Sequence, residues 1–384
     1  MKRLHFIKIN KMKRTNLNRR LFIKTSALFG ASLLFQNPLK AFPTENTEGV
    51  LQPKSFINNP NLKTILSAEK WKGTPLDKEE RFMNHEFPFR HSMSAVLGWK
   101  LFKRNPQHNE KKRDTFKQPV LKTDAFLLHS ENTVVWLGHA SFFVRINGVN
   151  ILIDPVFDNI PTMRRRSDLP CEAAKFKNID YILVSHSHFD HCDKETMKLV
   201  TQNNPNAKIL TGLNLDKTLR RWSPNHDIQG AGWYQQFKTD SNIEVTFLPT
   251  RHWSKRNLND TNKTLWGSFV IKSGEKTVYF AADSGYGSHF KEVGELFPNI
   301  DVTMIGIGAY SPRWFMHAVH QDPEQAAQAF NEMGAKVMIP MHYGTFNQTD
   351  EPASEPPRLM QEIIANGKVK NQVKFPQLGE DVFY

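Results

Sequence analysis

The stretch that decides the fold of this chain runs over residues 179–191 and reads IDYILVSHSHFDH. Its first part, Ile179–Ser185, is a continuous apolar run of the length of a buried strand. Four residues of the types that bind metals follow within six positions: His186, His188, Asp190 and His191. Alternation places the two nearer histidines on one side if the strand continues, and a tight turn directs the other two to a second position. Imidazole and carboxylate are the ligands that borderline divalent metals such as Zn²⁺ prefer, so the stretch predicts a metal site.

Three further candidate ligands follow apolar runs later in the chain. His252 comes after the run that ends at Leu248-Pro249, Asp283 after Thr277–Ala281, and His342 after Val337–Pro340. Sites in α/β proteins are assembled at the carboxyl ends of strands. We therefore expect these side chains to lie near the first cluster.

The apolar pattern predicts many short strands with helices between them. Asn147-Gly148 separates two β-rich runs and is a strong hairpin signal. Asp322 and Pro323 are typical of a helix start, here for a helix over Pro323–Met333. The remaining predicted elements are strands at Thr133–Leu137, Ser141–Ile146, Val149–Asp154, Lys208–Thr211, Ile243–Pro249, Gly267–Lys272 and Val302–Gly306, and a helix at Lys194–Asn203. This order favours two sheets packed between outer helices.

The formal charge of the 384-residue chain is concentrated at its start. Residues 1–41 hold six Lys and four Arg and no acidic residue, which accounts for +10 of the total of +13. The rest of the chain is nearly neutral, so we expect no nucleic-acid partner.

The start of the chain is typical of a targeting segment. Residues 18–24 read NRRLFIK and match the twin-arginine export pattern, and the apolar run Ala27–Phe35 is too short to span a bilayer. We therefore expect a twin-arginine signal peptide over residues 1–41, the export machinery as a partner, and a periplasmic or otherwise extracytoplasmic location. A basic amphipathic helix is the alternative.

Composition divides the rest of the chain into three parts. Residues 42–70 are polar, with Pro and Asn, and indicate a linker. Residues 71–130 carry aromatic positions among charges and predict a mostly irregular or helical extension that packs on the main body. Residues 131–384 hold the regular pattern and form the predicted catalytic domain. Cys171 and Cys192 are the two cysteines; they could form one disulfide but no disulfide framework.

The metal-binding stretch resembles the signature of the metallo-β-lactamase superfamily, a strand followed by H-x-H-x-D-H. Other segments resemble the branch that contains N-acyl-phosphatidylethanolamine-hydrolysing phospholipase D, and the resemblance covers about residues 71–384. They are WLGHAS at 136–141, PTRHWSKR at 249–256, DTNKTLWGS at 260–268, IGIGAYSPR at 305–313 and HQDPEQA at 320–326, together with Arg81, Phe82, Asn84 and Trp99. The fold that this implies is an α+β, four-layer αβ/βα sandwich.

The resemblance also implies how the ligands are shared between two divalent ions, for which Zn²⁺ is favoured and Fe or Mn are alternatives. One ion is expected on His186, His188 and His252, the other on Asp190, His191 and His342, with Asp283 bridging them. Asp190 and His320 are expected to act in catalysis, the latter by orienting the substrate or aiding the leaving group. The expected supporting or substrate-contacting residues are His139, Arg251, Trp253 and Tyr310.

The predicted activity is hydrolysis of a phosphodiester, in the manner of a phospholipase D acting on an N-acyl-phosphatidylethanolamine-like lipid, with contact to a membrane surface. The alternatives are a lactonase or cyclic phosphodiesterase on the same site, or a non-catalytic metal- or lipid-binding protein. The chain departs from the branch after Asp154-Pro155, where a short loop leads to Arg164, Arg165 and Arg166. These arginines either engage phosphate or form a solvated basic turn.

Overall fold

The computed structural model describes residues 52–86, 98–99, 101, 103–161, 163–240 and 242–384. Residues Val50–Tyr384 belong to one compact unit. The predicted signal peptide lies outside the described residues. Among the described helices, none combines the length and the apolarity that crossing a membrane requires.

The first sheet has seven strands, and both of its faces are apolar. In one strand, Val134 and Trp136 belong to the core between the sheets, whereas Val135 and Leu137 belong to a core on the other face. A sheet covered on both faces needs such continuous apolar runs. In spatial order the strands are β17 (Asp381–Phe383), β4 (Thr133–Gly138), β5 (Ser141–Ile146), β6 (Val149–Ile153), β7 (Tyr181–Val184), β8 (Lys208–Gly212) and β9 (Ile228–Ala231).

The second sheet has eight strands and packs face to face on the first through one large core. Large aromatic residues such as Phe142 of the first sheet and Phe280 of the second meet there, with ring centroids 6.1 Å apart. In spatial order its strands are β16 (Gln372–Val373), β15 (Val337–Met341), β14 (Val302–Gly306), β13 (Lys276–Phe280), β12 (Ser268–Ser273), β11 (Glu244–Leu248), β10 (Gln235–Gln236) and β2 (Lys63–Thr64).

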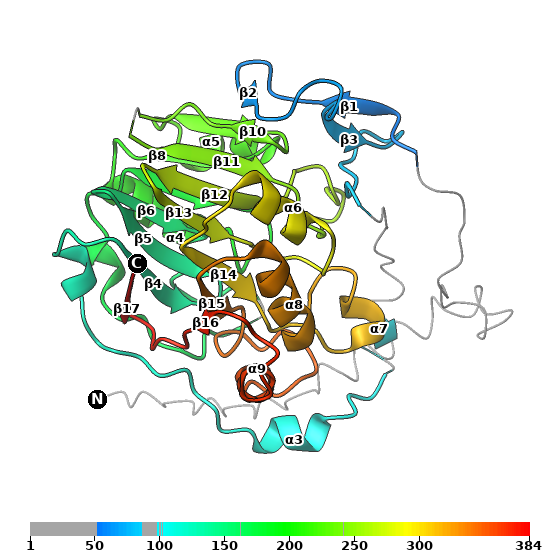
Figure 1. Ribbon diagram of the computed structural model, residues 1–384, viewed down its shortest axis with the longest axis vertical. Helices are drawn as coiled ribbons and strands as arrows, with labels where there is room; N and C mark the ends of the chain where they lie inside the picture. The colour runs from blue at the N-terminus through cyan, green and yellow to red at the C-terminus, as the bar shows by residue number, and fades with distance from the viewer. Residues whose placement is uncertain (1–51, 87–97, 100, 102, 162, 241) are drawn as a thin grey trace, which may run out of the picture. The chain divides into compact units, whose positions relative to one another are not determined.

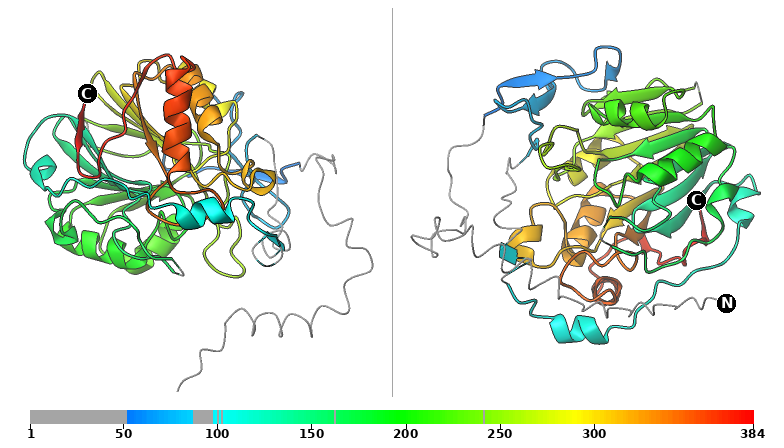
Figure 2. Two further views of the ribbon diagram at one scale, coloured as in Figure 1. Left: turned by 90° about the horizontal axis from the view of Figure 1, so that it is seen from below. Right: turned by 180° about the vertical axis from the view of Figure 1, so that it is seen from behind.

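Helices cover the two outer faces (Figures 1 and 2). The first sheet is covered by α4 (Lys194–Asn203) and α5 (Leu215–Trp222). The second is covered by α6 (His289–Leu296), α8 (Pro323–Met333) and α9 (Glu355–Ala365). Short elements lie in the connections: α3 (His108–Arg113), α7 (Arg313–Met316), η1 (Ala125–Leu127) and η2 (Ala173–Lys175). The predicted four-layer αβ/βα sandwich is confirmed, and α8 begins as predicted, with the Asp322 carboxylate accepting a hydrogen bond from the Gln325 N–H at 2.9 Å.

The topology brings the ends of several strands to one edge of the sandwich. In the first sheet, β4, β6 and β7 run in the same direction, and in the second sheet β11, β13, β14 and β15 do. All seven predicted ligands, and His139, follow the carboxyl ends of β4, β7, β11, β13 and β15. These residues therefore lie close together because the strands that precede them run in the same direction within each sheet.

The described part of the predicted linker is structured, which corrects that prediction. β1 (Ser55–Ile57) pairs with β3 (Thr74–Leu76), and β2 adds the edge strand of the second sheet next to β10. Sequence pattern missed these strands because two or three residues are too few to show a period.

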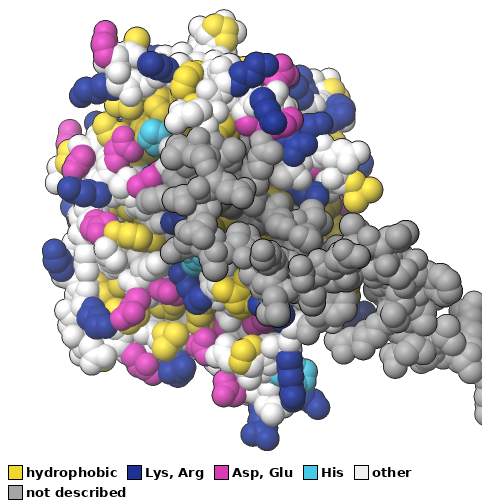
Figure 3. Space-filling view, turned by 90° about the vertical axis from the view of Figure 1, so that its right-hand side faces the viewer, with side chains coloured by type: hydrophobic (Ala, Val, Ile, Leu, Met, Phe, Trp, Pro, Cys, Tyr) yellow, Lys and Arg dark blue, Asp and Glu magenta, His cyan; other side chains and the backbone are white. Residues whose placement is uncertain are grey.

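The described part of the extension packs on the main body, as expected. The Trp99 indole donates a hydrogen bond to the Asp350 carboxylate at 2.8 Å, and Phe82 N–H donates to the Asn262 carbonyl at 2.8 Å. On the face drawn in Figure 3, basic and acidic side chains are interspersed. This mixture of charges agrees with the small formal net charge of residues 42–384.

Candidate metal centre

Three imidazoles meet in the first cluster. His188 Nδ1 lies 2.9 Å from His186 Nε2 and 3.2 Å from His252 Nε2. Two of these histidines come from the turn after β7, and the third comes from the loop after β11 in the opposite sheet. The cluster therefore lies where the two sheets meet.

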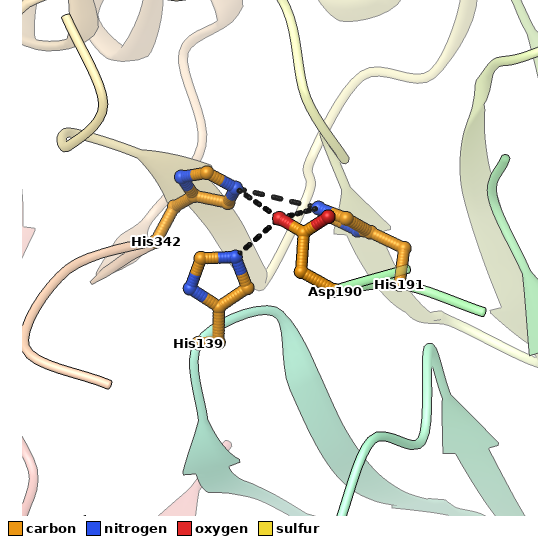
Figure 4. Close-up of side chains that lie close together, drawn as sticks. All are labelled: His139, Asp190, His191 and His342. Atoms are coloured by element: carbon orange, nitrogen blue, oxygen red, sulfur yellow. Dashed lines mark hydrogen bonds and ion pairs between the residues drawn. The ribbon is translucent and has the colours of Figure 1, made fainter. Parts of the chain in front are cut away.

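Asp190, His191 and His342 form the second cluster, with His139 beside them (Figure 4). Asp190 Oδ2 lies 3.6 Å from Nε2 of both His191 and His342, and these two nitrogens are 3.3 Å apart. His139 Nε2 lies 2.8 Å from the same Asp190 oxygen. His139 thus contacts a predicted ligand, which is the supporting position expected for it.

Asp283 lies between the two clusters and contacts both. Its Oδ2 is 3.7 Å from His252 Nε2 and 3.9 Å from His186 Nε2. The same oxygen is 3.1 Å from His191 Nε2, and Oδ1 is 3.1 Å from His342 Nε2. Asp283 therefore lies within 4 Å of imidazole nitrogens of both clusters, and its bridging role stays a prediction.

The donor set fits divalent metal ions. The candidate ligand atoms within each cluster all lie within 4.8 Å of one another and belong to buried or half-buried side chains. Ring nitrogens that face each other at 2.9 to 3.3 Å need either a shared proton or a positive ion between them. Imidazole with carboxylate is the ligand chemistry of Zn²⁺ and similar ions.

Asp154, which directly follows β6, supports the centre but was not among the predicted site residues. Its Oδ2 lies 2.7 Å from His191 Nδ1 and accepts the Ser185 hydroxyl at 2.5 Å. The Ser185 Oγ in turn lies 2.9 Å from His186 Nδ1. One buried carboxylate thus orients ligands of both clusters, a role that metal-bound histidines generally require. The apolar run ending at Asp154 was the available signal, because it has the same form as the runs before the ligands.

The loop of His252 is held by the extension. The Asn84 side chain accepts the His252 N–H at 3.0 Å and donates to the His252 carbonyl at 2.8 Å. His252 Nδ1 lies 3.1 Å from the Val319 carbonyl, so its Nε2 is directed to the cluster. Asn84 belongs to the motifs that carry the family resemblance. Its contact with His252 could not be predicted from the sequence, because the two residues are 168 positions apart.

Several residues of the centre adopt a strained backbone. His139, Asp154, Ala282 and His342 have φ values of 54°, 42°, 52° and 68°. This left-handed region is unfavourable for residues other than glycine, and such strain persists where surrounding structure enforces it, often at functional sites. Each sharp turn follows a strand end and redirects the chain at the centre.

Electrostatics differ between the clusters in the metal-free protein. Burial lowers the pKa of His186 and His252 well below the usual range and that of His188 to about 4. Burial also opposes protonation of His342, but the nearby carboxylates Asp283 and Asp190 outweigh it and raise this pKa to about 9. His191 is raised for the same reason. Protons therefore remain on the second cluster at neutral pH.

His320 lies beside both clusters of the centre. Its half-buried ring is 5.1 Å from the ring of His342 and 5.2 Å from that of His252, measured between centroids. Burial lowers the pKa of His320 to about 3, so the ring is neutral at pH 7. This position suits the predicted role beside the substrate.

Arg251 and Trp253 flank a ligand, as expected, and support it by different contacts. Arg251 Nη1 donates to the Tyr286 carbonyl at 3.0 Å, and its backbone N–H donates to Ser284 Oγ at 3.0 Å, next to Asp283. The Trp253 ring packs edge-on against His188 at 4.9 Å.

Tyr310 contacts the start of α9, and its expected role as a supporting or substrate-contacting residue stays a prediction. Its hydroxyl donates to the Glu355 carboxylate at 2.6 Å, and the side chain is 6% exposed. It therefore anchors the start of α9. The apolar ring of Tyr310 is buried, and its hydroxyl finds a hydrogen-bond partner, as is usual for buried tyrosines.

The three arginines after Asp154 have different environments. Arg165 donates to the carbonyls of Leu137, Val156 (2.7 Å) and Ser167 (2.9 Å), so it holds the loop together. Arg164 and Arg166 are exposed. The two cysteines, Cys171 and Cys192, are free thiols.

Comparison with known proteins identifies the family. The profile of the Beta-lactamase superfamily domain matches residues 149–343, which include all seven predicted ligands. The chain belongs to the metallo-β-lactamase superfamily. It is a metal-dependent hydrolase of that superfamily, and its relatives place it in the branch predicted from sequence.

Three similar proteins are named as a phospholipase D or as a metal-dependent hydrolase. The chain is 32% identical over 267 residues to N-acyl-phosphatidylethanolamine-hydrolyzing phospholipase D 1 of Caenorhabditis elegans, over 64% of this chain and 74% of that protein. It is 28% identical to the mitochondrial enzyme of the same name from Saccharomyces cerevisiae, over 64% of this chain but only 54% of that protein. It is 30% identical to a UPF0173 metal-dependent hydrolase of Caldivirga maquilingensis, over 61% and 92%.

Solved structures share the fold. Igni18, a metallo hydrolase from Ignicoccus hospitalis, superposes with a TM-score of 0.52 at 22% identity, over 66% of this chain and 98% of that one. An isothiocyanate hydrolase from Delia radicum gut bacteria gives 0.53 at 16% identity, over 66% and 99%. At these identities the likeness concerns architecture alone.

Proposed function

We propose that this protein is a phosphodiesterase that binds two divalent metal ions and cleaves a lipid of the N-acyl-phosphatidylethanolamine type at its head-group bond. The observation that carries the proposal is the position of Asp283, whose Oδ2 lies within 4 Å of imidazole nitrogens of both ligand clusters. Divalent ions held by these residues would activate a water molecule and neutralise negative charge on the oxygens of the reacting phosphoryl group. The names of the nematode and yeast relatives support the substrate class.

The chain's own residues would orient and support this reaction. Asp154 and Ser185 hold the ring orientations of His191 and His186 through their Nδ1 atoms. His139 keeps Asp190 aimed at the second cluster by a 2.8 Å contact to its Oδ2. The neutral ring of His320, beside His342, would hydrogen-bond a substrate oxygen.

Turnover by purified, Zn²⁺-loaded protein tests the proposal. We expect hydrolysis of bis(p-nitrophenyl) phosphate, and release of phosphatidic acid and an N-acylethanolamine from N-acyl-phosphatidylethanolamine, detected by mass spectrometry. His188→Ala and Asp283→Ala should each lower the rate by at least about two orders of magnitude. Asp227→Ala, which removes an exposed carboxylate at the start of β9, is the matched control.

Two outcomes would contradict the proposal. Wild-type rates no higher than those of the two ligand variants on every diester would indicate a binding protein. Hydrolysis of an acyl-homoserine lactone with no action on diesters would indicate a lactonase on the same centre.

We also propose that the twin-arginine segment exports the protein, which would place its chemistry outside the cytoplasm. Replacement of Arg19 and Arg20 by Lys should retain the protein in the cytoplasmic fraction. Unchanged export of that variant would overturn this part of the proposal.

A further inference from the structure

Two loops from opposite sheets supply the three histidines of the first cluster. The turn after β7 carries His186 and His188, and the loop after β11 carries His252. The facing ring nitrogens of His188 and His252 are 3.2 Å apart. Strand pairing within one sheet does not fix the distance between loops of different sheets, so side-chain contacts around the ligands must set this spacing.

Arg256 lies on the loop of His252 and contacts the turn after β7. Its Nη1 donates to the Cys192 carbonyl at 2.5 Å and to the Ser187 carbonyl at 3.1 Å. These two carbonyls flank residues 188–191, which include three of the predicted ligands. One side chain of the His252 loop therefore holds both ends of the ligand-bearing segment.

Two aromatic rings pack on the Arg256 guanidinium. Its Cζ lies over the Phe189 ring, 4.2 Å from the centroid, and over the ring of Trp222, the last residue of α5, at 4.9 Å. Phe189 belongs to the same ligand-bearing segment and is half-buried. A planar guanidinium stacks on aromatic rings while its N–H groups donate in the plane, so packing and hydrogen bonds fix the same orientation.

The loop that carries Arg256 is held by hydrogen bonds of its own. The Asp260 carboxylate accepts the Arg256 N–H at 3.0 Å, and the Asn262 side chain accepts the Ser254 N–H at 3.1 Å. The Ser254 hydroxyl donates to the Thr264 carbonyl at 2.5 Å. None of these groups is a predicted metal ligand, so the loop places Arg256 independently of metal.

We propose that Arg256 is a positioning residue of the metal centre, which holds the turn after β7 against the His252 loop and so sets the spacing of the first cluster. The inference goes beyond the proposed function, because it applies to any reaction at this centre. The second cluster instead joins the turn to His342, whose N–H donates to the His139 carbonyl at 3.1 Å. Loss of the Arg256 contacts should therefore weaken the first cluster more than the second.

Zn²⁺ titrations against a chelator test the inference in two backgrounds. His342→Ala leaves the first cluster to be measured, and His252→Ala leaves the second. Arg256→Met keeps the apolar part of the side chain and removes its donors. We expect it to lower the affinity of the first cluster, relative to that of the second, by about tenfold or more. Arg221→Met is the matched control, because Arg221 is exposed on α5 and donates to Thr218 of the same helix at 3.2 Å.

Arg256→Lys is the conservative variant. It keeps the positive charge, but an ammonium cannot lie over the rings as a planar group and donate to both carbonyls. We therefore expect it to lower the ratio of the two affinities by about threefold or more. This variant also decides the question if circular dichroism of the metal-free protein shows that Arg256→Met does not fold.

An unchanged ratio in Arg256→Met would overturn the inference, as would an equal fall of the ratio in Arg221→Met. If only Arg256→Lys folds, an unchanged ratio in that variant would overturn it. General destabilisation would weaken both clusters together, so the ratio separates positioning from stability. Metal binding requires no turnover, and failure here is therefore distinct from failure of the diester assays.

Discussion

The two halves of the metal centre have similar donors but different surroundings. In the first cluster, His186 and His252 contact a hydroxyl and a backbone carbonyl through Nδ1. In the second cluster, His191 lies between the carboxylates of Asp154 and Asp283. Neutral supports leave buried histidines unprotonated, whereas carboxylates stabilise the imidazolium form.

This difference gives the clusters different proton requirements for metal binding. A metal entering the first cluster meets imidazoles whose pKa values are already low. A metal entering the second must displace protons from His191 and His342. We infer that the first cluster fills more readily at low pH and that the second controls when the centre is complete.

The largest expected effect is on the pH dependence of metal affinity. Because the pKa of His342 is raised to about 9, protons compete with metal below that pH, and affinity of the second cluster should rise about tenfold per pH unit for each proton displaced. Zn²⁺ titrations against a chelator at pH values of about 6 and 8 would measure this. His252→Ala removes a ligand of the first cluster, so the Zn²⁺ affinity of this variant reports on the second cluster. His342→Ala reports on the first cluster in the same way. If Zn²⁺ affinity changed with pH equally in the two variants, the two clusters would not differ in the protons that metal binding displaces.

Removal of Asp154 should weaken the second cluster more than the first, because Asp154 contacts His191 directly and His186 only through Ser185. Asp154→Ala deletes the acceptor at 2.7 Å from His191 Nδ1, and loss of such a partner typically costs about 10- to 100-fold in metal affinity. The same titrations measure it. Ser185→Ala is the matched change at the first cluster, where it removes the hydroxyl 2.9 Å from His186 Nδ1. An equal loss at both clusters in Asp154→Ala would show that its role is general rather than selective.

The smallest effect is expected from the extension. Asn84→Ala removes two hydrogen bonds to the backbone of His252 and should lower the free energy of unfolding by about 1–3 kcal/mol. It should weaken the first cluster more than the second. Denaturant unfolding and Zn²⁺ titration would measure these effects, with the exposed Asn225→Ala as control. Stability equal to that of the control would mean that the extension does not hold the His252 loop.

The apolar pattern of the sequence predicted the longer strands of the two sheets and the residue types of the candidate ligands. Apolar runs such as Ile179–Ser185 and Val337–Pro340 are long enough to show a buried strand, and each ligand directly follows such a run. Burial on both faces of a sheet requires that pattern, so it is readable without coordinates. The short strands β2, β9, β10, β16 and β17 carry no such pattern and were not predicted.

The contacts between these side chains could be seen only in the tertiary structure. It placed Asp283 between the clusters, Asn84 on His252, Gln348 on Asp190, and the Tyr310 hydroxyl on Glu355. These partners are distant in sequence, and their contacts depend on strand directions and on strained turns such as the one at His342. Local pattern records whether a residue is buried and which donors it offers. The distance between two donors follows from the packing of the whole sandwich.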